Sequence, residues 1–175
     1  EVAPEIREYE RFSTTVCNAY VQPLMARYLS RIKAGLEKKD IYSPFLLITS
    51  GGGLTTLETA RKFPIRLVES GPAGGAILAS KLSSQLGSNA SLSFDMGGTT
   101  AKLCLINAGE PRLSRQFEVD RSYRFKKGSG LPLKIPVIEM LEIGAGGGSI
   151  AHVDKISRIK VGPESNHPNS SRTVF

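Results

Sequence analysis

One nine-residue stretch of the sequence, FDMGGTTAK at 94–102, concentrates residue types that bind metal ions and phosphate. In chain order these are a carboxylate, two glycines, two hydroxyls and a lysine: Asp95, Gly97, Gly98, Thr99, Thr100 and Lys102. A carboxylate at the end of a strand can hold Mg²⁺ directly or through water, because hard cations take oxygen ligands. Glycines let the backbone cradle phosphate oxygens, the hydroxyls add donors, and a lysine that faces the ligand neutralises phosphate charge. The same residues also suit a hairpin turn capped by an aspartate, so the stretch alone leaves both interpretations open.

Three other glycine-rich segments also follow apolar runs: TSGGG at 49–53, ESGPAGG at 69–75 and EIGAGGGS at 142–149. A single glycine turn is usually only a turn, but successive amide groups in such a turn form a nest for anions. A helix predicted to follow the second segment adds the partial positive charge of its N-terminus. Four such segments at the ends of predicted strands favour a phosphate site, because ligands bind at strand ends of α/β sheets.

Common nucleotide and hydrolase motifs are absent from the sequence. There is no G-x-x-x-x-G-K-[ST] phosphate loop and no G-x-S-x-G elbow, and neither histidine has an obvious nucleophilic partner. GAGGGS at 144–149 fits the dinucleotide fingerprint poorly, because its spacing is G-x-G-x-G and no clear helix follows. The chemistry is therefore expected to reside in the glycine turns.

The elements that must position these turns indicate a mixed α/β domain. Apolar residues recur at three- and four-residue spacing over 12–38. This spacing predicts a long amphipathic helix whose apolar stripe packs in the core. Pro23 is expected to kink this helix or to mark its true start. The stripe includes Val16, Tyr20, Leu24, Tyr28 and Leu29.

Shorter helices are predicted at 54–63 and 71–87. Strands are predicted at 44–50, as a buried strand, and at 65–70, 91–96, 101–108, 110–120 and 135–143. Helices and strands alternate in the first half, whereas 91–120 forms a meander through two tight turns. This pattern indicates an α/β fold with a mixed sheet and flanking helices.

The composition narrows the class of protein. A chain of 175 residues allows one domain or two small lobes, and 40% apolar residues suffice for a core. The net charge of +7 is spread along the chain, and only 121–134 concentrates bases without an acid between them. We interpret that segment as a solvated loop, with an anionic ligand or a partner subunit as the alternative. Few aromatic residues interleave with the bases, which argues against nucleic acid.

The cysteines and the chain ends indicate the cellular compartment of the protein. Cys17 and Cys104 form no C-x-x-C pair, and two histidines make a zinc site improbable. We therefore expect a reduced, cytoplasmic protein. No apolar run approaches the roughly 18 residues of a membrane span, and the acidic start lacks the apolar core of a signal peptide. Because the chain does not begin with Met, we expect a fragment or a processed chain.

Four segments together resemble the hydantoinase A/5-oxoprolinase family. They are EIREYERFSTTVCNAYVQPLMARYL (5–29), TSGGGLTTLETARKFPIRLVESGPAGGA (49–76), FDMGGTTAKLCLI (94–106) and EIGAGGGSIAHVD (142–154). The strand followed by D-x-G-G-T-[ST] also resembles the phosphate loop of the actin, sugar-kinase and Hsp70-like ATPases. The order and spacing of all four segments carry the resemblance, which covers nearly all of 1–163.

The resemblance implies a fold, a reaction and cofactors. It implies a lobe of the actin-like, ribonuclease H-like ATPase fold, and ATP and Mg²⁺ as cofactors. The family includes ATP-dependent enzymes that open cyclic amides such as N-methylhydantoin and 5-oxoproline, which is the implied function here, with a hydantoinase B-type partner subunit. It also includes ketone carboxylase subunits for acetone or acetophenone, in which ATP likewise activates an oxygen. A non-catalytic nucleotide-binding or interaction module is a third possibility.

Site residues follow from the match of each motif. Asp95 is implied as the catalytic residue and Mg²⁺ ligand. Nucleotide contacts are implied for Gly97, Gly98, Thr99, Thr100, Lys102, Gly144, Gly146, Gly147, Gly148, Ser149, Gly74 and Gly75.

This sequence departs from the family pattern in two ways. Many members have an acid where this chain has Lys102, and the segment 121–138 is longer than in the plainer amidohydrolases. We associate both features with the carboxylase-like branch. Full-length members also carry another phosphate loop and further sequence. We therefore interpret 1–163 as a central portion of the ATPase domain and expect the isolated piece to be inactive. Residues 164–175 are interpreted as a disordered or non-native tail.

Overall fold

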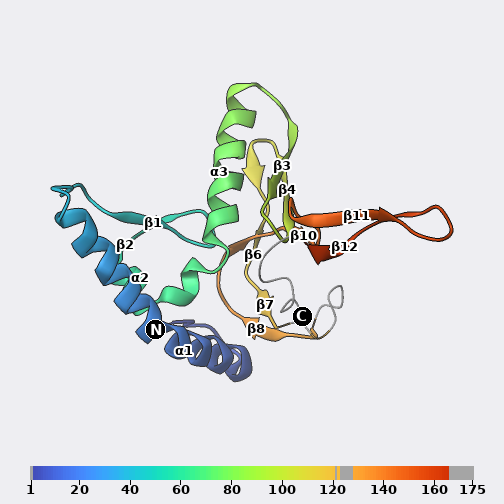
Figure 1. Ribbon diagram of the computed structural model, residues 1–175. Helices are drawn as coiled ribbons and strands as arrows, with labels where there is room; N and C mark the ends of the chain where they lie inside the picture. Colours follow the sequence, from blue (N-terminus) through green and yellow to red (C-terminus); the bar gives the residue numbers. More distant parts are fainter. Residues whose placement is uncertain (1, 121, 123–127, 166–175) are drawn as a thin grey trace. The chain divides into compact units, whose positions relative to one another are not determined.

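The computed structural model describes residues 2–120, 122 and 128–165, which belong to two compact units (Figure 1). The first unit combines Glu1–Gly74 with Leu113–Ile138, and the second combines Gly75–Arg112 with Glu139–Phe175. Each unit is thus built from two separate stretches of chain. The predicted boundary between 163 and 164 falls within the last strand, and residues 166–175 lie outside the described part.

The first unit holds the long N-terminal helix and several short elements. These are α1 (Glu8–Glu37), β1 (Leu46–Ile48), β2 (Leu54–Thr56), α2 (Leu57–Lys62), the 3₁₀ helix η1 (Pro64–Leu67), β6 (Leu113–Ser114), β7 (Phe117–Val119), β8 (Leu131–Leu133) and β9 (Val137–Ile138). Three antiparallel pairs form among them, namely β1 with β2, β6 with β9, and β7 with β8. The helix α3 (Ser70–Gln85) begins in this unit and continues into the second.

The helix α1 is continuous through Pro23, so the interpretation of Pro23 as the helix start is wrong. The predicted core stripe is also only partly correct. Leu29 is 1% exposed, whereas Val16, Tyr20 and Leu24 are 66%, 86% and 64% exposed. At about 100° per residue, the row through Val16, Tyr20 and Leu24 lies on the side of the helix away from the packed face. The buried positions of α1 are instead Thr14, Asn18 and Leu29.

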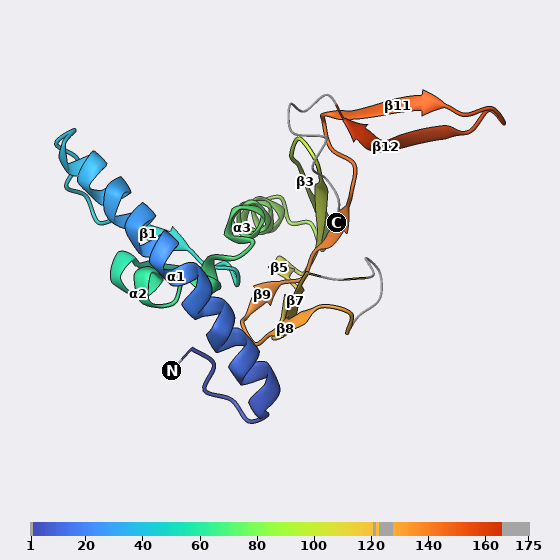
Figure 2. The same cartoon turned by 60° about the horizontal axis from the view of Figure 1, so that its bottom comes forward.

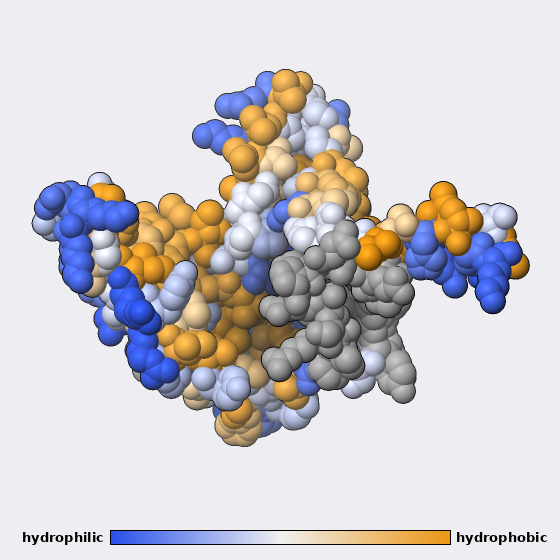
Figure 3. All heavy atoms as spheres, in the orientation of Figure 1, coloured by the Kyte–Doolittle hydropathy of each residue, from blue (hydrophilic) through white to orange (hydrophobic). Residues whose placement is uncertain are grey.

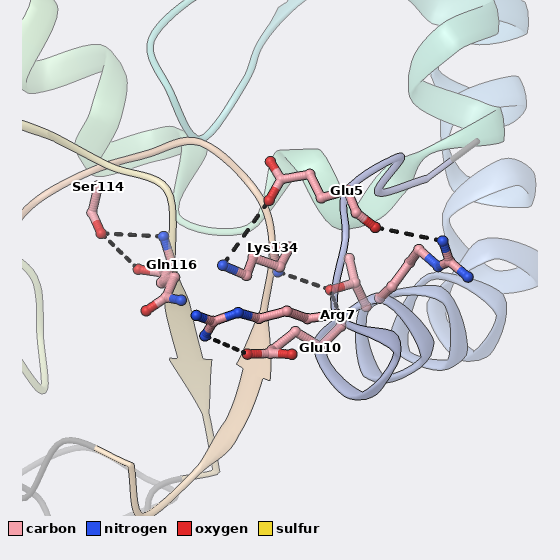
Figure 4. Close-up of polar contacts among 8 residues, drawn as sticks. Glu5, Arg7, Glu10, Ser114, Gln116 and Lys134 are labelled. Atoms are coloured by element: carbon pink, nitrogen blue, oxygen red, sulfur yellow. Dashed lines mark hydrogen bonds and ion pairs between the residues drawn. The ribbon is translucent and has the colours of Figure 1, made fainter.

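Two polar side chains of α1 connect it to the rest of the first unit. The Asn18 amide donates to the carbonyl of Lys62 at 3.1 Å, and its oxygen accepts the Ile65 N–H at 3.2 Å. The Thr14 hydroxyl accepts the backbone N–H of Lys134 at 2.8 Å, beside an ion pair of Lys134 with Glu5 (Figure 4). These contacts hold α1 against η1 and β8, where the core forms.

The core of the first unit consists of four buried aliphatic residues from η1 and the β8–β9 region: Ile65, Leu133, Ile135 and Val137. The predicted strand at 65–70 is wrong, because 64–67 forms η1 and α3 begins at Ser70. Proline fixes φ near the helical range and favours the first position of a helical turn, so Pro64 starts η1 instead of merely ending the helix before it.

Two neighbouring predictions need smaller corrections. Residues 54–56 pair as strand β2, and the helix α2 begins only after Thr56, whose hydroxyl accepts the Thr59 N–H. The strand predicted at 44–50 exists as β1, but it is not buried, since Leu46 and Ile48 are 49% and 40% exposed. Its turn is a glycine hairpin in which the Thr49 N–H donates to the Gly53 carbonyl at 2.8 Å.

The second unit contains the remaining strands. These are β3 (Ala90–Met96), β4 (Ala101–Asn107), β5 (Glu110–Pro111), β10 (Leu141–Ile143), β11 (Ser149–Val153) and β12 (Ile159–Ser165). The central sheet has the order β10–β4–β3, with β5 pairing with β4. The hairpin predicted from the stretch at 94–102 is confirmed, since β3 and β4 pair antiparallel from Ala90↔Asn107 to Met96↔Ala101.

Two predicted strands are broken at the boundaries between units. The strand predicted at 110–120 becomes β5, β6 and β7, and the strand predicted at 135–143 becomes β9 and β10. The chain leaves the second unit after Arg112 and returns to it at Glu139. A continuous strand would have to pair within the sheets of both units, so each segment forms separate short strands instead.

The two faces of the β3–β4 sheet differ in what covers them. On one face, Ser83 of α3 and Ser91 of β3 share a hydrogen bond between hydroxyls at 2.8 Å, and Cys104 is buried. On the other face, Leu92, Phe94 and Met96 are each more than half exposed. The class is α/β as predicted, but each strand pair in the described residues is antiparallel, so the sheet is not mixed in strand direction.

The strands β11 and β12 form a hairpin that projects from the sheet of the second unit (Figures 1 and 2). Apolar side chains lie along one side of it and polar side chains along the other (Figure 3). At its tip, both carboxylate oxygens of Asp154 accept hydrogen bonds, including the Nε–H of Arg158 at 3.0 Å. The tip is thus closed by one side chain.

Candidate functional site

The turn between β3 and β4 contains the predicted phosphate loop. Asp95 is the next-to-last residue of β3, and the Gly97 N–H donates to the Thr100 carbonyl at 2.9 Å to close the turn. Asp95, Gly97, Gly98 and Thr99 are exposed and Thr100 is half-buried. The stretch is therefore a hairpin turn in construction, with its polar groups at the surface of the second unit.

A second predicted motif lies directly against this turn. The N–H groups of Gly147 and Gly148 donate to the carbonyls of Gly97 and Gly98, both at 2.9 Å. The structure thereby brings together two motifs that are separated by about 50 residues in sequence. These two N–H groups serve the other loop, so they are not free to form an anion nest of their own.

Gly146 and Ser149 shape the second loop. A Cβ atom at Gly146 would lie 2.6 Å from the Gly97 carbonyl oxygen and 2.7 Å from Gly98 backbone atoms, so only glycine allows this approach. The Ser149 hydroxyl accepts the Gly146 N–H at 3.0 Å, and the Ser149 N–H donates to the Gly146 carbonyl at 2.9 Å. Both residues therefore support the first loop, while Gly144 connects β10 to this turn.

The first loop carries three consecutive unused backbone donors. Within the described ranges, the amide groups of Gly98, Thr99 and Thr100 donate to no acceptor, and the two threonine hydroxyls have no hydrogen-bond partner. The carbonyls of this loop are already engaged by Gly147 and Gly148. Consecutive N–H groups without acceptors are available to bind phosphate oxygens.

Charged residues on three adjacent strands form a row beside this loop. The strand register pairs Asp95 with Lys102 and Lys102 with Glu142. Directly opposed side chains lie on the same face of a sheet, so the three charges share one face. The Lys102 ammonium is 3.7 Å from the Glu142 carboxylate. Glu142 was not singled out from the sequence, because its partner depends on strand register.

Two other glycine segments do not form phosphate turns. Gly74 and Gly75 lie inside α3, so the helix predicted at 71–87 is confirmed, whereas the turn expected at 69–75 does not form. Gly74 instead allows Ile48 to approach, since a Cβ there would be 3.0 Å from the Ile48 Cδ1. The turn at 49–53 closes the β1–β2 hairpin, with Ser50 buried and its hydroxyl donating to the Arg66 carbonyl. Four of the five bases of the segment at 121–134 lie outside the described residues, namely Arg121, Arg124, Lys126 and Lys127.

The comparisons with known proteins establish the family. The family model described as hydantoinase/oxoprolinase matches residues 11–173. The chain belongs to the hydantoinase/oxoprolinase family. It is 42% identical over 168 residues to an uncharacterized protein of Methanocaldococcus jannaschii, covering 94% of this chain and 25% of that protein. It is 37% identical over 175 residues to the caprolactamase subunit alpha of Pseudomonas jessenii, covering 100% and 24%. Identity to the 5-oxoprolinase of Saccharomyces cerevisiae is 32% over 167 residues, covering 94% and 12%.

Two solved structures share the fold of this family member. A nucleotide-free acetone carboxylase matches with a TM-score of 0.71 and 29% identity, over 93% of this chain and 21% of that one. The ATP-dependent caprolactamase from Pseudomonas jessenii matches with a TM-score of 0.71 and 35% identity, over 96% and 23%. This likeness is consistent with the actin-like ATPase fold that the sequence predicts. The chain spans about a quarter or less of the length of the relatives it matches.

The residues of the first loop fit ATP and Mg²⁺, which the family relationship implies. Asp95 offers carboxylate oxygens of the kind that Mg²⁺ prefers, and this carboxylate has no ion pair or hydrogen bond in the described ranges. The neighbouring unused N–H and O–H groups are donors suited to phosphate oxygens.

Among the helices of the described residues, none has the length and apolar character to cross a membrane.

Proposed function

We propose that this chain supplies one phosphate-binding loop to the nucleotide site of an ATP-dependent enzyme that opens cyclic amides. The observation that carries this proposal is the exposed turn at 97–100. Its N–H groups are unused at Gly98, Thr99 and Thr100, while Gly147 and Gly148 fix its carbonyls. In this proposal, residues 1–163 are a central portion of a larger ATPase domain.

Each residue of the loop has a distinct role in this proposal. Asp95 holds Mg²⁺ through its carboxylate, and the amides of the 98–100 turn bind phosphate oxygens. The hydroxyls of Thr99 and Thr100 add donors that orient those oxygens. Gly147 and Gly148 hold the shape of the first loop through their N–H groups, and Gly146 and Ser149 hold the second loop through bonds to each other. Gly144 connects β10 to this second loop. When bound, MgATP supplies the phosphoryl group that activates an oxygen of the substrate.

The catalytic contribution of such a loop is positioning and charge stabilisation. Phosphoryl transfer requires the transferred group to be held in line and its negative charge to be compensated. Preorganised N–H groups do this without reorganising during the reaction. The loop at 97–100 is preorganised because its two carbonyls are bonded to the loop at 146–149.

The substrate class rests on the named relatives. A caprolactamase subunit and 5-oxoprolinases are among them, and their names indicate cyclic amides. A ketone carboxylase is the second candidate, because the acetone carboxylase structure matches with the same TM-score as the caprolactamase. We further propose a hydantoinase B-type partner subunit, since several relatives are named as subunits. A cytoplasmic location is also part of this proposal.

The test uses the full-length subunit together with its partner. Wild type is assayed for ATP hydrolysis with 5-oxoproline, caprolactam or a hydantoin, and separately with acetone and bicarbonate. Asp95→Asn should reduce substrate-dependent ATP hydrolysis by at least a hundredfold. Asp40→Asn is the matched control: Asp40 is exposed, and asparagine tolerates its positive φ of 58°. Unchanged ATP turnover in Asp95→Asn would contradict the assignment of Asp95 to the nucleotide site.

The choice between cyclic amide and ketone follows from which substrate stimulates ATP hydrolysis. Stimulation by acetone with bicarbonate and by no cyclic amide would replace the first proposal with the second. Calorimetry of the 175-residue chain with MgATP addresses the third possibility, a nucleotide-binding module. Tight binding by this chain, combined with no stimulation by any substrate, would favour that module.

A further inference from the structure

The row of charges across β10, β4 and β3 has an unequal arrangement. Lys102 lies between two carboxylates, directly opposite Asp95 on β3 and Glu142 on β10. Its ammonium lies 3.7 Å from Glu142, and its side chain is only 16% exposed, against 51% for Glu142. Among the described residues, the Asp95 carboxylate takes part in no ion pair. The lysine is thus directed toward one of its two acidic neighbours.

This arrangement matters because an ammonium and a metal ion compete for the same carboxylate. Directly opposed residues have Cβ atoms about 5 Å apart, so the four-carbon side chain of Lys102 can reach Asp95 as well as Glu142. An ammonium placed on Asp95 would favour its charged form but would also occupy the oxygens that a divalent cation needs. The position of the Lys102 ammonium therefore influences whether Asp95 can bind a cation.

We propose that Glu142 is a positioning residue that holds the Lys102 ammonium on the β10 side of the row and so keeps Asp95 open to a divalent cation. The inference rests on the proposed role of Asp95 as the Mg²⁺ ligand. It adds that this role depends on a residue from a different strand. The ion pair connects the strand that leads into the second loop with the strand that leaves the first loop.

Removing Glu142 has two effects that must be separated. The first is a field effect, because one negative charge about two strand spacings from Asp95 is lost. At about 10 Å in water of physiological ionic strength, where salt screens the interaction, this changes the affinity for a divalent cation by about twofold. The second is the loss of the Glu142 ion pair, after which the Lys102 ammonium can shift toward Asp95 and compete with the cation by a further two- to fivefold. Only the second effect requires Lys102.

The experiment measures Mn²⁺ binding to the 175-residue chain by paramagnetic broadening of the backbone amide signals of Gly97, Gly98 and Thr99. Mn²⁺ alone is the probe, at a fixed ionic strength. Wild type should show saturable broadening that Asp95→Asn abolishes. Glu142→Gln should weaken Mn²⁺ binding about three- to tenfold in the wild-type background. In the Lys102→Met background the same change should weaken it by no more than about twofold.

Two further variants separate geometry from charge. Glu142→Asp keeps the charge but withdraws the carboxylate by one methylene group, so it should weaken Mn²⁺ binding in a manner that Lys102→Met suppresses. Glu139→Gln removes the same charge from a residue that pairs with Arg112 at 2.9 Å. Its effect should be within about twofold and equal in both backgrounds. Dispersed amide spectra establish that each variant is folded.

The outcomes distinguish this inference from the proposed function. Equal weakening by Glu142→Gln with and without Lys102 overturns the positioning role, while the role of Asp95 stands if Asp95→Asn still abolishes broadening. Broadening that Asp95→Asn leaves unchanged overturns both. Suppression of the Glu142→Gln and Glu142→Asp effects by Lys102→Met supports the inference, because a merely structural role of Glu142 would not depend on Lys102.

Discussion

Gly147 donates its backbone N–H to the carbonyl oxygen of Gly97 at 2.9 Å, and Gly148 does the same for Gly98. The predicted phosphate loop therefore owes its shape to a turn about 50 residues further along the chain. Because carbonyls face the partner loop, the amides of Gly98, Thr99 and Thr100 remain for a ligand. The glycine-rich motif at 144–149 thus acts on the predicted phosphate loop through the backbone.

The first prediction concerns the close approach of these loops. Gly146→Ala places a Cβ atom 2.6 Å from the Gly97 carbonyl oxygen, and the obstructing atoms are backbone. The loops must separate, so we expect a loss of about 1–3 kcal/mol in local stability. Hydrogen exchange of the Gly147 and Gly148 amides should speed up accordingly.

Gly75→Ala is the control, because Gly75 lies in α3 with nothing within 4 Å of its Cβ position. Alanine there should stabilise by about 0.5–1 kcal/mol. Equal exchange rates in the two variants would contradict the packing argument.

The β3–β4 hairpin could be predicted from the sequence because the pattern that specifies it is local. Short apolar runs predict β3 and β4, and glycines between them predict the turn. Family motifs also identified both loops. The helix predicted at 71–87 forms as α3 and starts one residue earlier, so its first turn takes up the glycines for which a ligand-binding turn was also expected. The sequence could not show that Gly74, inside this helix, makes room for Ile48 of a distant strand.

The remaining errors are all consequences of tertiary structure. The strands predicted at 110–120 and 135–143 were divided where the chain passes between units, and no local pattern marks those points. The pairing of Lys102 with Glu142 depends on the register of β4 and β10, which are separated by some 40 residues. Tyr20 has the periodicity of a core residue but is 86% exposed, because helical period alone does not say which face is packed.

The second prediction concerns the buried amide of α1. Asn18→Ala removes the acceptor of the Ile65 N–H and a donor to the Lys62 carbonyl, at a residue that is only 5% exposed. Leaving a buried donor unsatisfied costs about 1–3 kcal/mol, which urea unfolding measures as a lower midpoint. Gln22→Ala is the matched control, since Gln22 donates to the same Lys62 carbonyl at 3.2 Å from an exposed position. Its cost should stay within about 0.5 kcal/mol. Similar midpoints for both variants would show that Asn18 does not hold α1.

The third prediction concerns the thiol of Cys104, which is 2% exposed. Burial raises the pKa of Cys104, and the nearby charge of Glu139 raises it further. A raised pKa leaves less thiolate at a given pH, and thiolate is the reactive form. Iodoacetamide at pH 8 should therefore modify Cys104 at least tenfold more slowly in the folded chain than in urea, as followed by peptide mass spectrometry. Glu139→Gln should raise the folded-state rate modestly. Rapid modification of folded wild type would contradict the burial of this thiol.

The fourth prediction concerns acid and the β11–β12 hairpin. The backbone N–H of Arg158 is the largest cause that lowers the pKa of Asp154, and further hydrogen bonds from Ile156, Arg158 and Lys160 act in the same direction. A carboxyl whose pKa is lower in the folded state stabilises that state above its unfolded pKa of about 3.9. This contribution is lost as pH falls from about 4 through the folded pKa. The hairpin tip should therefore open in acid before the β3–β4 sheet does.

An NMR titration of the Asp154 carboxyl carbon tests this directly. The midpoint should lie below that of an aspartate in the unfolded chain, and the Ile156 and Arg158 amides should shift with the same midpoint. Asp154→Asn keeps an oxygen acceptor but cannot titrate, so its tip signals should not move over the same pH range. A wild-type midpoint at or above the unfolded value would mean that these hydrogen bonds do not favour the carboxylate. Tip signals that titrate equally in Asp154→Asn would assign the transition to another group.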